Sequence, residues 1–254
     1  MLNIIHRVLA GSDMKNFYLK FTTFILFFVG VLYAQSASGW HDETHLAVAK
    51  ASGYYKWYNA VGADIAKLKA GSIESYNHFF NNTDNIEVTP ELIFKQAKNY
   101  NDARDKDGHL YGAIVASLRQ YSSGVKTGKY SEYHLAFASH YIADLSQPLH
   151  NMPYDRFNKS RHKINDGTVE KVILDNLDKL KQRMYPVHIR QDHFEEDLAK
   201  EIAKIANRAR ELGFILKKEN RNITKEEAYT QLGQSASLLK AVVDYPWKSV
   251  GDIL

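Results

Sequence analysis

The sequence contains no cysteine and only five prolines among its 254 residues. Without cysteine, disulfide bonds and thiolate metal sites are excluded, so any metal must be held by histidine and carboxylate side chains. The scarcity of proline leaves long segments free to form uninterrupted helices. A strong net charge is also lacking: the value is +4, and residues 1–39 hold three of the Lys and Arg residues against one acidic residue. The charge is therefore weak evidence for a nucleic-acid partner.

The N-terminal segment has the composition of a secretory signal. Two lysines precede the apolar residues 24–33, and a stretch of small residues ends at Gly39. The apolar run is too short to favour an uncleaved membrane anchor. The pattern predicts a signal peptide over 1–39, cleavage before Trp40, and a secreted or periplasmic protein. Met14 is an alternative start to Met1, because it opens a signal peptide of more usual length.

The rest of the chain, 40–254, predicts one all-α domain, a single-domain multi-helix bundle. Apolar residues make up 44% of the chain, which is enough for one buried core. Thr89 before Pro90, and the capping box from Thr224 to Glu227, mark two helix starts. The apolar periodicity predicts helices over 43–53, 56–70, 90–105, 110–124, 130–147, 164–184, 194–213 and 225–244.

Two further features of this pattern concern single segments. Residues 151–161 contain Pro153 and a polar run, which predicts a loop. The helix over 194–213 carries one apolar stripe at helical spacing, which predicts a core-facing side. The stripe consists of Leu198, Ile202, Ile205, Ala209 and Leu212.

A repeated His and Asp spacing is the strongest local signal. His140 and Asp144 lie four residues apart, as do His162 and Asp166, and His150 stands between the two pairs. Side chains four apart project from one face of a helix, so each pair can grip one metal ion. Either pair alone is more typical of a helix-surface ion pair. The repetition in an apolar setting favours metal, because a divalent cation compensates buried ionisable groups.

Upstream, Asp64 and His78-Phe79 complete a longer order of residue types. The order Trp, His, Asp, His-Phe, His-x3-Asp-x5-His, His-x3-Asp, which starts at Trp40, resembles the zinc-dependent superfamily that joins bacterial phospholipase C to the single-strand nucleases of the P-one and S-one type. The resemblance covers nearly the whole predicted mature chain. It implies the all-helical bundle of that superfamily and hydrolysis of phosphodiester bonds by a metal-bound hydroxide, without a covalent enzyme intermediate.

The resemblance also implies three zinc ions per chain. An α-amino nitrogen binds metal only if no residue precedes it, which agrees with cleavage before Trp40. The implied ligands are Asp64, His78, His140 and Asp144 for the first zinc; His150, His162 and Asp166 for the second; and the amino group and carbonyl of Trp40, His45 and a shared oxygen of Asp144 for the third.

The same resemblance implies catalytic and substrate-binding residues. Asp64 would orient the nucleophile, and Lys67 stands where the nucleases carry an arginine that stabilises the transition state. Phe79 matches an aromatic residue that stacks on a base, although a core position explains it equally well. Asn81 replaces a common Asp, which weakens base recognition, and Glu43 coincides with a carboxylate that contacts choline in one phospholipase branch.

Both substrate classes therefore stay open, a phospholipid head group or single-stranded nucleic acid. The choline cage is incomplete, because Ile65 stands where that branch has an aromatic residue. We expect a monomer with no membrane anchor after processing. The alternative from another class is a non-catalytic helical binding module that zinc stabilises. The remaining histidines match no ligand position: His41, His109, His134, His188 and His193.

Overall fold

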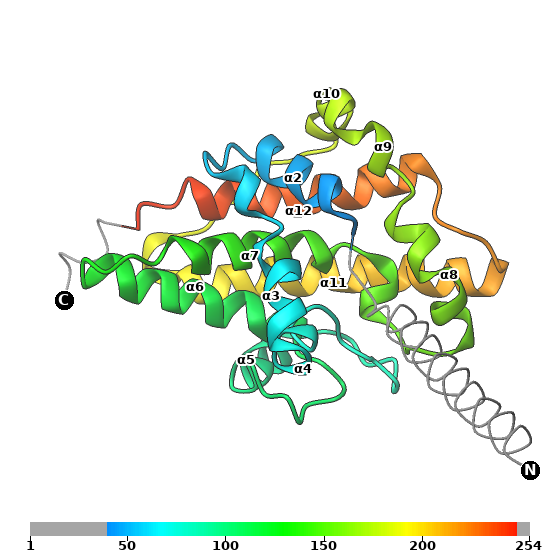
Figure 1. The fold of residues 1–254 in the computed structure, drawn as a ribbon, viewed down its shortest axis with the longest axis horizontal. Coiled ribbons are helices and arrows are strands. Elements are labelled where there is room, and N and C mark those ends of the chain that lie inside the picture. Colours follow the sequence, from blue (N-terminus) through cyan, green and yellow to red (C-terminus); the bar gives the residue numbers. More distant parts are fainter. Residues whose placement is uncertain (1–39, 248–254) are drawn as a thin grey trace, which may run out of the picture. The chain divides into compact units, whose positions relative to one another are not determined.

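The computed structural model describes residues 40–247, and every regular element in that range is a helix (Figure 1). The predicted all-α class is confirmed, and no strand occurs among these residues. The predicted signal peptide, 1–39, lies outside the described residues. The α-helices are α2 (Asp42–Ala51), α3 (Gly62–Ala70), α4 (Ser72–Ser75), α5 (Pro90–Ala97), α6 (Leu110–Lys126), α7 (Glu132–Leu145), α8 (Arg156–Asp166), α9 (Glu170–Ile173), α10 (Leu177–Lys181), α11 (Phe194–Glu219) and α12 (Lys225–Val243). Four 3-10 helices join them: η1 (Trp57–Asn59), η2 (Pro148–Asn151), η3 (Leu174–Asn176) and η4 (Gln191–His193).

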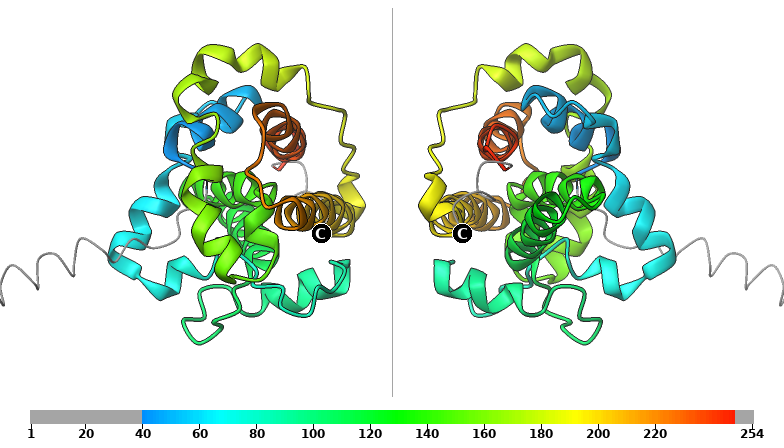
Figure 2. Two further views of the ribbon diagram at one scale, coloured as in Figure 1. Left: turned by 90° about the vertical axis from the view of Figure 1, so that its right-hand side faces the viewer. Right: turned by 90° about the vertical axis from the view of Figure 1, so that its left-hand side faces the viewer.

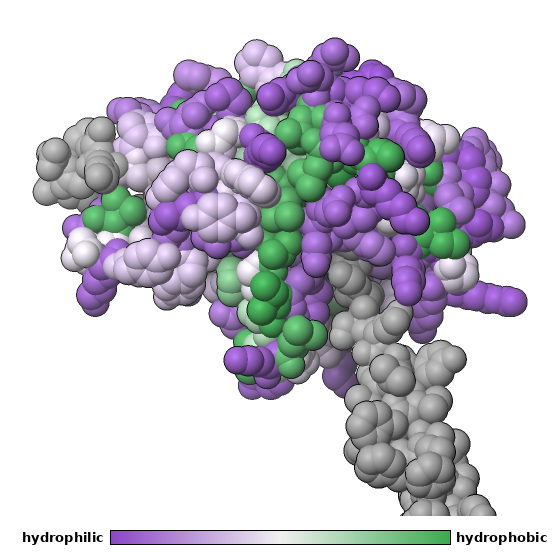
Figure 3. All heavy atoms as spheres, turned by 45° about the horizontal axis from the view of Figure 1, so that its top comes forward, coloured by the Kyte–Doolittle hydropathy of each residue, from purple (hydrophilic) through white to green (hydrophobic). Residues whose placement is uncertain are grey.

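The long helices α6, α7, α11 and α12 run side by side and form the centre of the bundle (Figures 1 and 2). The α6–α7 pair makes the most extensive contact between elements, and α12 packs on both α7 and α2. The shorter helices lie around this centre. The face shown in Figure 3 is largely hydrophilic apart from a strip of hydrophobic side chains that crosses it. Among residues 40–247, no helix is long and apolar enough to cross a membrane.

The apolar stripe of α11 faces the core as predicted. Leu198, Ile202, Ile205 and Ala209 are fully buried, and Leu212 packs against the core from its edge. The helix runs on to Glu219, six residues past its predicted end. Asn220, in the left-handed conformation, ends it. The stripe supports the bundle and contributes no group to the sites described below.

Both predicted helix starts are confirmed. The side chain of Thr89 accepts a hydrogen bond from the backbone N–H of Leu92, with Pro90 in the first turn. Thr224 and Glu227 form the reciprocal capping box at the start of α12.

The predicted loop over 151–161 is wrong in its second half. Helix α8 begins at Arg156, because the Asp155 side chain accepts a hydrogen bond from the backbone N–H of Asn158 and caps the helix. The predicted helix 164–184 is also wrong. It is interrupted at Gly167, where α8 ends, and continues only as the short segments α9, η3 and α10.

Two other predicted helices are shorter than expected. The segment 56–70 forms η1 and then α3, which starts only at Gly62. The segment 90–105 is helical only to Ala97. Asn101 beyond it adopts a left-handed conformation and exchanges hydrogen bonds with Asn77, so local side-chain bonding replaces the helical ladder.

Candidate metal centre

Eight of the predicted ligands converge from six separate parts of the bundle. Helix α2 supplies His45, α3 supplies Asp64, and the turn after α4 supplies His78. Helix α7 supplies His140 and Asp144, and η2 supplies His150. Helix α8 supplies His162 and Asp166. We call His45, Asp64, His78, His140 and Asp144 the Asp144 group, and His150, His162 and Asp166 the Asp166 group.

The Asp144 group holds two sets of potential metal ligands that share His140. The ligand atoms of His45, His140 and Asp144 all lie within 4.8 Å of one another, as do those of Asp64, His78 and His140. Asp144 is fully buried, with Oδ2 3.0 Å from His78 Nδ1 and 3.3 Å from His140 Nε2, and Oδ1 3.4 Å from His45 Nε2. Each oxygen of this carboxylate therefore faces a different set of imidazoles, and each set could hold a metal ion.

The Asp166 group forms a third set of potential ligands. The Nε2 atoms of His150 and His162 lie 3.1 Å apart, and Asp166 Oδ2 lies 3.6 Å from His162 Nε2. The group meets the first one through Asp144, whose Oδ1 is 3.9 Å from His150 Nδ1. The two groups are therefore neighbours in one buried region.

Backbone carbonyls fix the orientation of two imidazoles. His140 donates from Nδ1 to the carbonyl of Ala60 at 2.7 Å, and His150 donates from Nδ1 to the carbonyl of His78 at 2.6 Å. A carbonyl oxygen only accepts, so each Nδ1 carries the proton and each Nε2 presents a lone pair. This arrangement is typical of metal-ligating histidine.

Side-chain amides serve the Asp166 group in the same way. Asn158, one turn before His162 on α8, places its Oδ1 2.6 Å from the His162 Nδ1. Gln147 donates from Nε2 to Asp166 Oδ1. The two remaining ligand atoms, His162 Nε2 and Asp166 Oδ2, lie 3.6 Å apart.

His78 has a carboxylate partner instead. Its Nδ1 faces Asp144, and its Nε2 lies 3.3 Å from Glu74 Oε1 without the alignment of a hydrogen bond. Glu74 is buried and accepts hydrogen bonds from the Tyr141 hydroxyl at 2.5 Å and from Asn77 Nδ2 at 3.2 Å. Glu74 is therefore held in place behind the ligand.

Several buried polar atoms of the Asp144 group have no hydrogen-bond partner. Burying such atoms unpaired costs free energy of about 1–3 kcal/mol each, and cations would satisfy the three that face the ligand sets, which are His45 Nε2, Asp64 Oδ2 and Asp144 Oδ1. Residues of this type and spacing fit a divalent transition metal such as zinc. The atoms are both ring nitrogens of His45, Asp64 Oδ2, His78 Nε2 and Asp144 Oδ1.

The pKa values in the Asp144 group fit a site that attracts positive charge. Burial lowers the pKa of His45 to about 3, so this imidazole is neutral at pH 7. Burial opposes the charged form of His140 too, but Asp64 and Asp144 raise its pKa to about 9. The two carboxylates thus attract a proton to His140 where a metal ion would otherwise supply the positive charge.

The Asp166 group behaves differently. Burial lowers the pKa of His150 to about 4 and raises the pKa of the Asp166 carboxyl well above its usual range. A metal ion would hold Asp166 ionised, which is the form that binds.

The segment that leads into α2 is anchored from across the sequence. Glu170, at the start of α9, accepts hydrogen bonds from the backbone N–H groups of Glu43 and Thr44 at 2.8 and 3.1 Å, and from the Thr44 hydroxyl at 2.8 Å. These bonds cap α2 and position His45. Trp40, just before α2, is fully buried, and its Nε1 has no hydrogen-bond partner. Ligation by a Trp40 amino group stays a prediction, because this nitrogen is a peptide nitrogen in the unprocessed chain.

The structure brings the predicted catalytic residues to the group. Lys67 is buried, and its Nζ lies 2.7 Å from Asp64 Oδ1. Burial alone would raise the pKa of Asp64, but the charges of His140 and Lys67 hold it below its usual range. Asp64 is 15% exposed at its side chain, which makes it the most accessible member of its metal-ligand set.

The three residues predicted to bind substrate differ in their exposure and in their contacts. Phe79 is half-buried and packs against Gly108, while Glu43 is exposed at the start of α2. Asn81 donates to Asp107 and accepts from the backbone N–H of Tyr154, so it ties two loops together. The structure gives Asn81 a structural role in addition to its predicted one.

The remaining histidines do not join the ligand sets. His109 is buried between Asp105 and Asn77, with Nδ1 and Nε2 3.0 and 2.9 Å from their oxygens. The residues that the sequence analysis missed are the partners of the ligands, Glu74 and Asn158 above all. Each precedes a ligand histidine by four residues, a spacing that was visible in the sequence.

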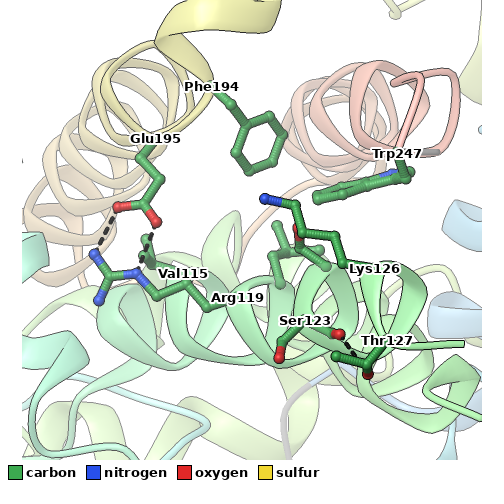
Figure 4. A pocket seen from close by; sticks show the side chains of 10 residues that line it. Val115, Arg119, Ser123, Lys126, Thr127, Phe194, Glu195 and Trp247 are labelled. Carbon is green, nitrogen blue, oxygen red and sulfur yellow. Dashed lines mark hydrogen bonds and ion pairs between the residues drawn. The ribbon is translucent and has the colours of Figure 1, made fainter. Parts of the chain in front are cut away.

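A separate hollow of about 390 Å³ lies between α6 and the start of α11 (Figure 4). Arg119, Lys126, Phe194 and Trp247 contribute to its walls, and Arg119 pairs with Glu195 at 2.6 Å. None of the predicted site residues lines it.

Comparison with protein-family models, curated proteins and solved structures gives no match to this chain.

Proposed function

We propose that the protein is a zinc-dependent hydrolase that cleaves phosphodiester bonds, of the phospholipase C and P-one nuclease type. One observation supports this most: eight side chains of metal-binding chemistry, scattered over 45–166, meet in two adjoining groups that Asp144 links. A structural ion-pair network would satisfy its own polar atoms, whereas the Asp144 group leaves several unpartnered. Adjoining metal sites are typical of enzymes that hydrolyse phosphate esters.

The proposed metal content is three zinc ions. Asp64, His78, His140 and Asp144 would hold the first, the Asp166 group the second, and Trp40, His45 and Asp144 the third. Bound zinc would supply Lewis acidity and neutralise charge on the phosphoryl oxygens.

The residues of this chain would contribute position and charge. Asp64 Oδ2, buried and without a hydrogen-bond donor, would accept a hydrogen bond from the attacking water and orient it for in-line attack. Lys67, beside the same carboxylate, would contact a phosphoryl oxygen as charge builds up on it. No side chain is required as a nucleophile.

The proposed setting is outside the cytoplasm, after removal of residues 1–39, with the protein acting as a monomer. The substrate class is a phospholipid head group or a single-stranded nucleic acid. The half-buried Phe79 next to His78 would suit a base, and the exposed Glu43 would suit a choline cation.

Hydrolysis of bis-p-nitrophenyl phosphate by the purified protein tests the proposal. We expect activity that a chelator abolishes and added zinc restores, and that Asp64→Asn lowers by at least about 100-fold. Lys171→Ala, a change at an exposed position on α9, serves as the matched control and should keep full activity. Bound zinc without any hydrolysis would instead favour the non-catalytic binding module.

A further inference from the structure

Helix α3 carries large apolar side chains on its outer side. Ile65 and Leu68 are 60% and 87% exposed, and Ile73 on the adjoining α4 is 46% exposed. A folded protein seldom leaves neighbouring aliphatic side chains so open to water unless another surface covers them. The hydrophobic strip in Figure 3 crosses the part of the molecule where Figure 1 places α3.

Exposed tyrosines lie near the start of α3. Tyr55, Tyr130 and Tyr133 are 69%, 74% and 49% exposed. Lys56 joins two of them, with its Nζ 5.0 Å from the ring centre of Tyr55 and 5.7 Å from that of Tyr130. The Tyr133 ring lies 6.5 Å from Phe137, which in turn contacts Gly62 at the start of α3. We call Tyr55, Ile65, Leu68, Ile73, Tyr130 and Tyr133 the α3 face.

The α3 face adjoins the candidate metal centre. Asp64 and Lys67 point from α3 into the Asp144 group, and the next residue after each, Ile65 and Leu68, faces solvent. One short helix therefore separates the proposed reacting atoms from an exposed apolar surface.

The charges around this face favour an anionic partner. Lys69 and Lys129 are exposed beside it. The nearby carboxylates are already engaged: Glu132 contacts Tyr55 and Lys56, and Asp64 pairs with Lys67. The surface thus combines exposed aliphatic side chains with tyrosines and lysines, the composition that suits the boundary between lipid chains and head groups.

We propose that the α3 face docks the protein peripherally on a lipid bilayer that contains anionic head groups. Ile65, Leu68 and Ile73 enter the boundary of the acyl chains, the tyrosines lie at head-group level, and the lysines contact the anionic lipids. Docking in this way brings the metal centre against the plane where phospholipid phosphodiesters lie. In naming the partner of that site, the inference rests on the proposed function. A polynucleotide strand would stack on the tyrosines but would leave Ile65, Leu68 and Ile73 exposed to water.

Co-sedimentation with vesicles of phosphatidylcholine and phosphatidylglycerol tests the docking. We expect the wild-type protein to sediment with the vesicles, and the double variant Ile65→Ser, Leu68→Ser to partition at least about tenfold less, because two aliphatic side chains no longer leave water. The matched control is Ile86→Ser with Ile215→Ser, at positions 42% and 46% exposed elsewhere on the surface. This control should bind as the wild type does.

Wild-type hydrolysis of bis-p-nitrophenyl phosphate tests the proposed function separately, because that substrate needs no membrane. A protein that hydrolyses it but ignores vesicles would overturn the docking alone. Equal binding by the double variant would overturn it too, since charge would then suffice. Binding of single-stranded DNA that is lost in Tyr55→Ala with Tyr130→Ala, with no vesicle binding, would assign the face to nucleic acid and overturn the proposal.

Discussion

The two ligand groups lie side by side but are built in different ways. The Asp166 group comes from η2 and α8, within seventeen consecutive residues, 150–166. The Asp144 group draws on α2, α3, the turn after α4 and α7, over residues 45–144. A local unit thus adjoins a group that exists only when distant segments have packed together.

Their supporting contacts differ in the same sense, apart from that of His150, whose Nδ1 donates to the carbonyl of the distant His78. Asn158 lies four residues from His162, and Gln147 nineteen residues from Asp166. In the Asp144 group, Ala60 is eighty residues from His140. The Asp144 group therefore depends on the whole bundle, and the predictions below separate it from its neighbour.

The largest effect is expected from Asp144→Asn, because this carboxylate faces both sets of imidazoles in its group. We expect the chain to lose two zinc ions together and to lose activity more than about 100-fold, since even outer partners of metal ligands typically contribute 10- to 100-fold. Asp166→Asn should remove only one. Metal content by mass spectrometry measures both, and equal losses from the two variants would break the distinction between the groups.

An additional residue before Trp40 should affect the Asp144 group alone. With the α-amino nitrogen converted to a peptide nitrogen, we expect one zinc ion to be lost while the Asp166 group stays loaded. The comparison needs two mature proteins, one that begins at Trp40 and one with a single preceding glycine, analysed by native mass spectrometry. Identical zinc content would show that the terminal amine is dispensable.

Glu74→Gln should weaken zinc binding by the Asp144 group about tenfold, because the carboxylate behind His78 loses its charge. The matched variant Asn158→Ala should do the same to the Asp166 group. Competition with a chromophoric chelator resolves the two affinities. If Glu74→Gln altered only folding stability and left every zinc affinity unchanged, its supporting role would be refuted.

The smallest effect is expected from Glu170→Ala, which removes the cap on α2. Loss of a helix cap should lower the free energy of unfolding by about 1 kcal/mol. Urea denaturation measures this, with Lys171→Ala as the neighbouring control. A change below the error of the control would mean that α2 is held by its packing on α12 instead.

The helical class, the helical spacing of two His and Asp pairs, and two helix starts could be predicted because each rests on short-range patterns. His140 with Asp144, and His162 with Asp166, follow helical spacing, and Thr224 with Glu227 follows a capping pattern. The sequence also predicted most of the core-facing stripe of α11. These features depend on residues within a few turns of one another.

Two of the errors occurred where a single residue outweighed the polarity or the apolar periodicity of its segment. Asp155 starts a helix inside a polar run that predicted a loop, and Gly167 interrupts an apolar periodicity that predicted a continuous helix. The role of Glu170 could not be assigned at all. It acts through Thr44, 126 residues away, which only the packed bundle brings within reach.

The clamp between Glu170 and α2 spans 126 residues, and this has a consequence for the order of folding. Closing so long a loop is entropically costly and slow, so α2 is expected to dock late. During synthesis, the emerging chain contains His45 from an early stage but lacks the carboxylate that fixes it until α9 has left the ribosome. The segment 150–166 could gather its ligands sooner, and metal loading would then proceed from the local unit to the assembled one.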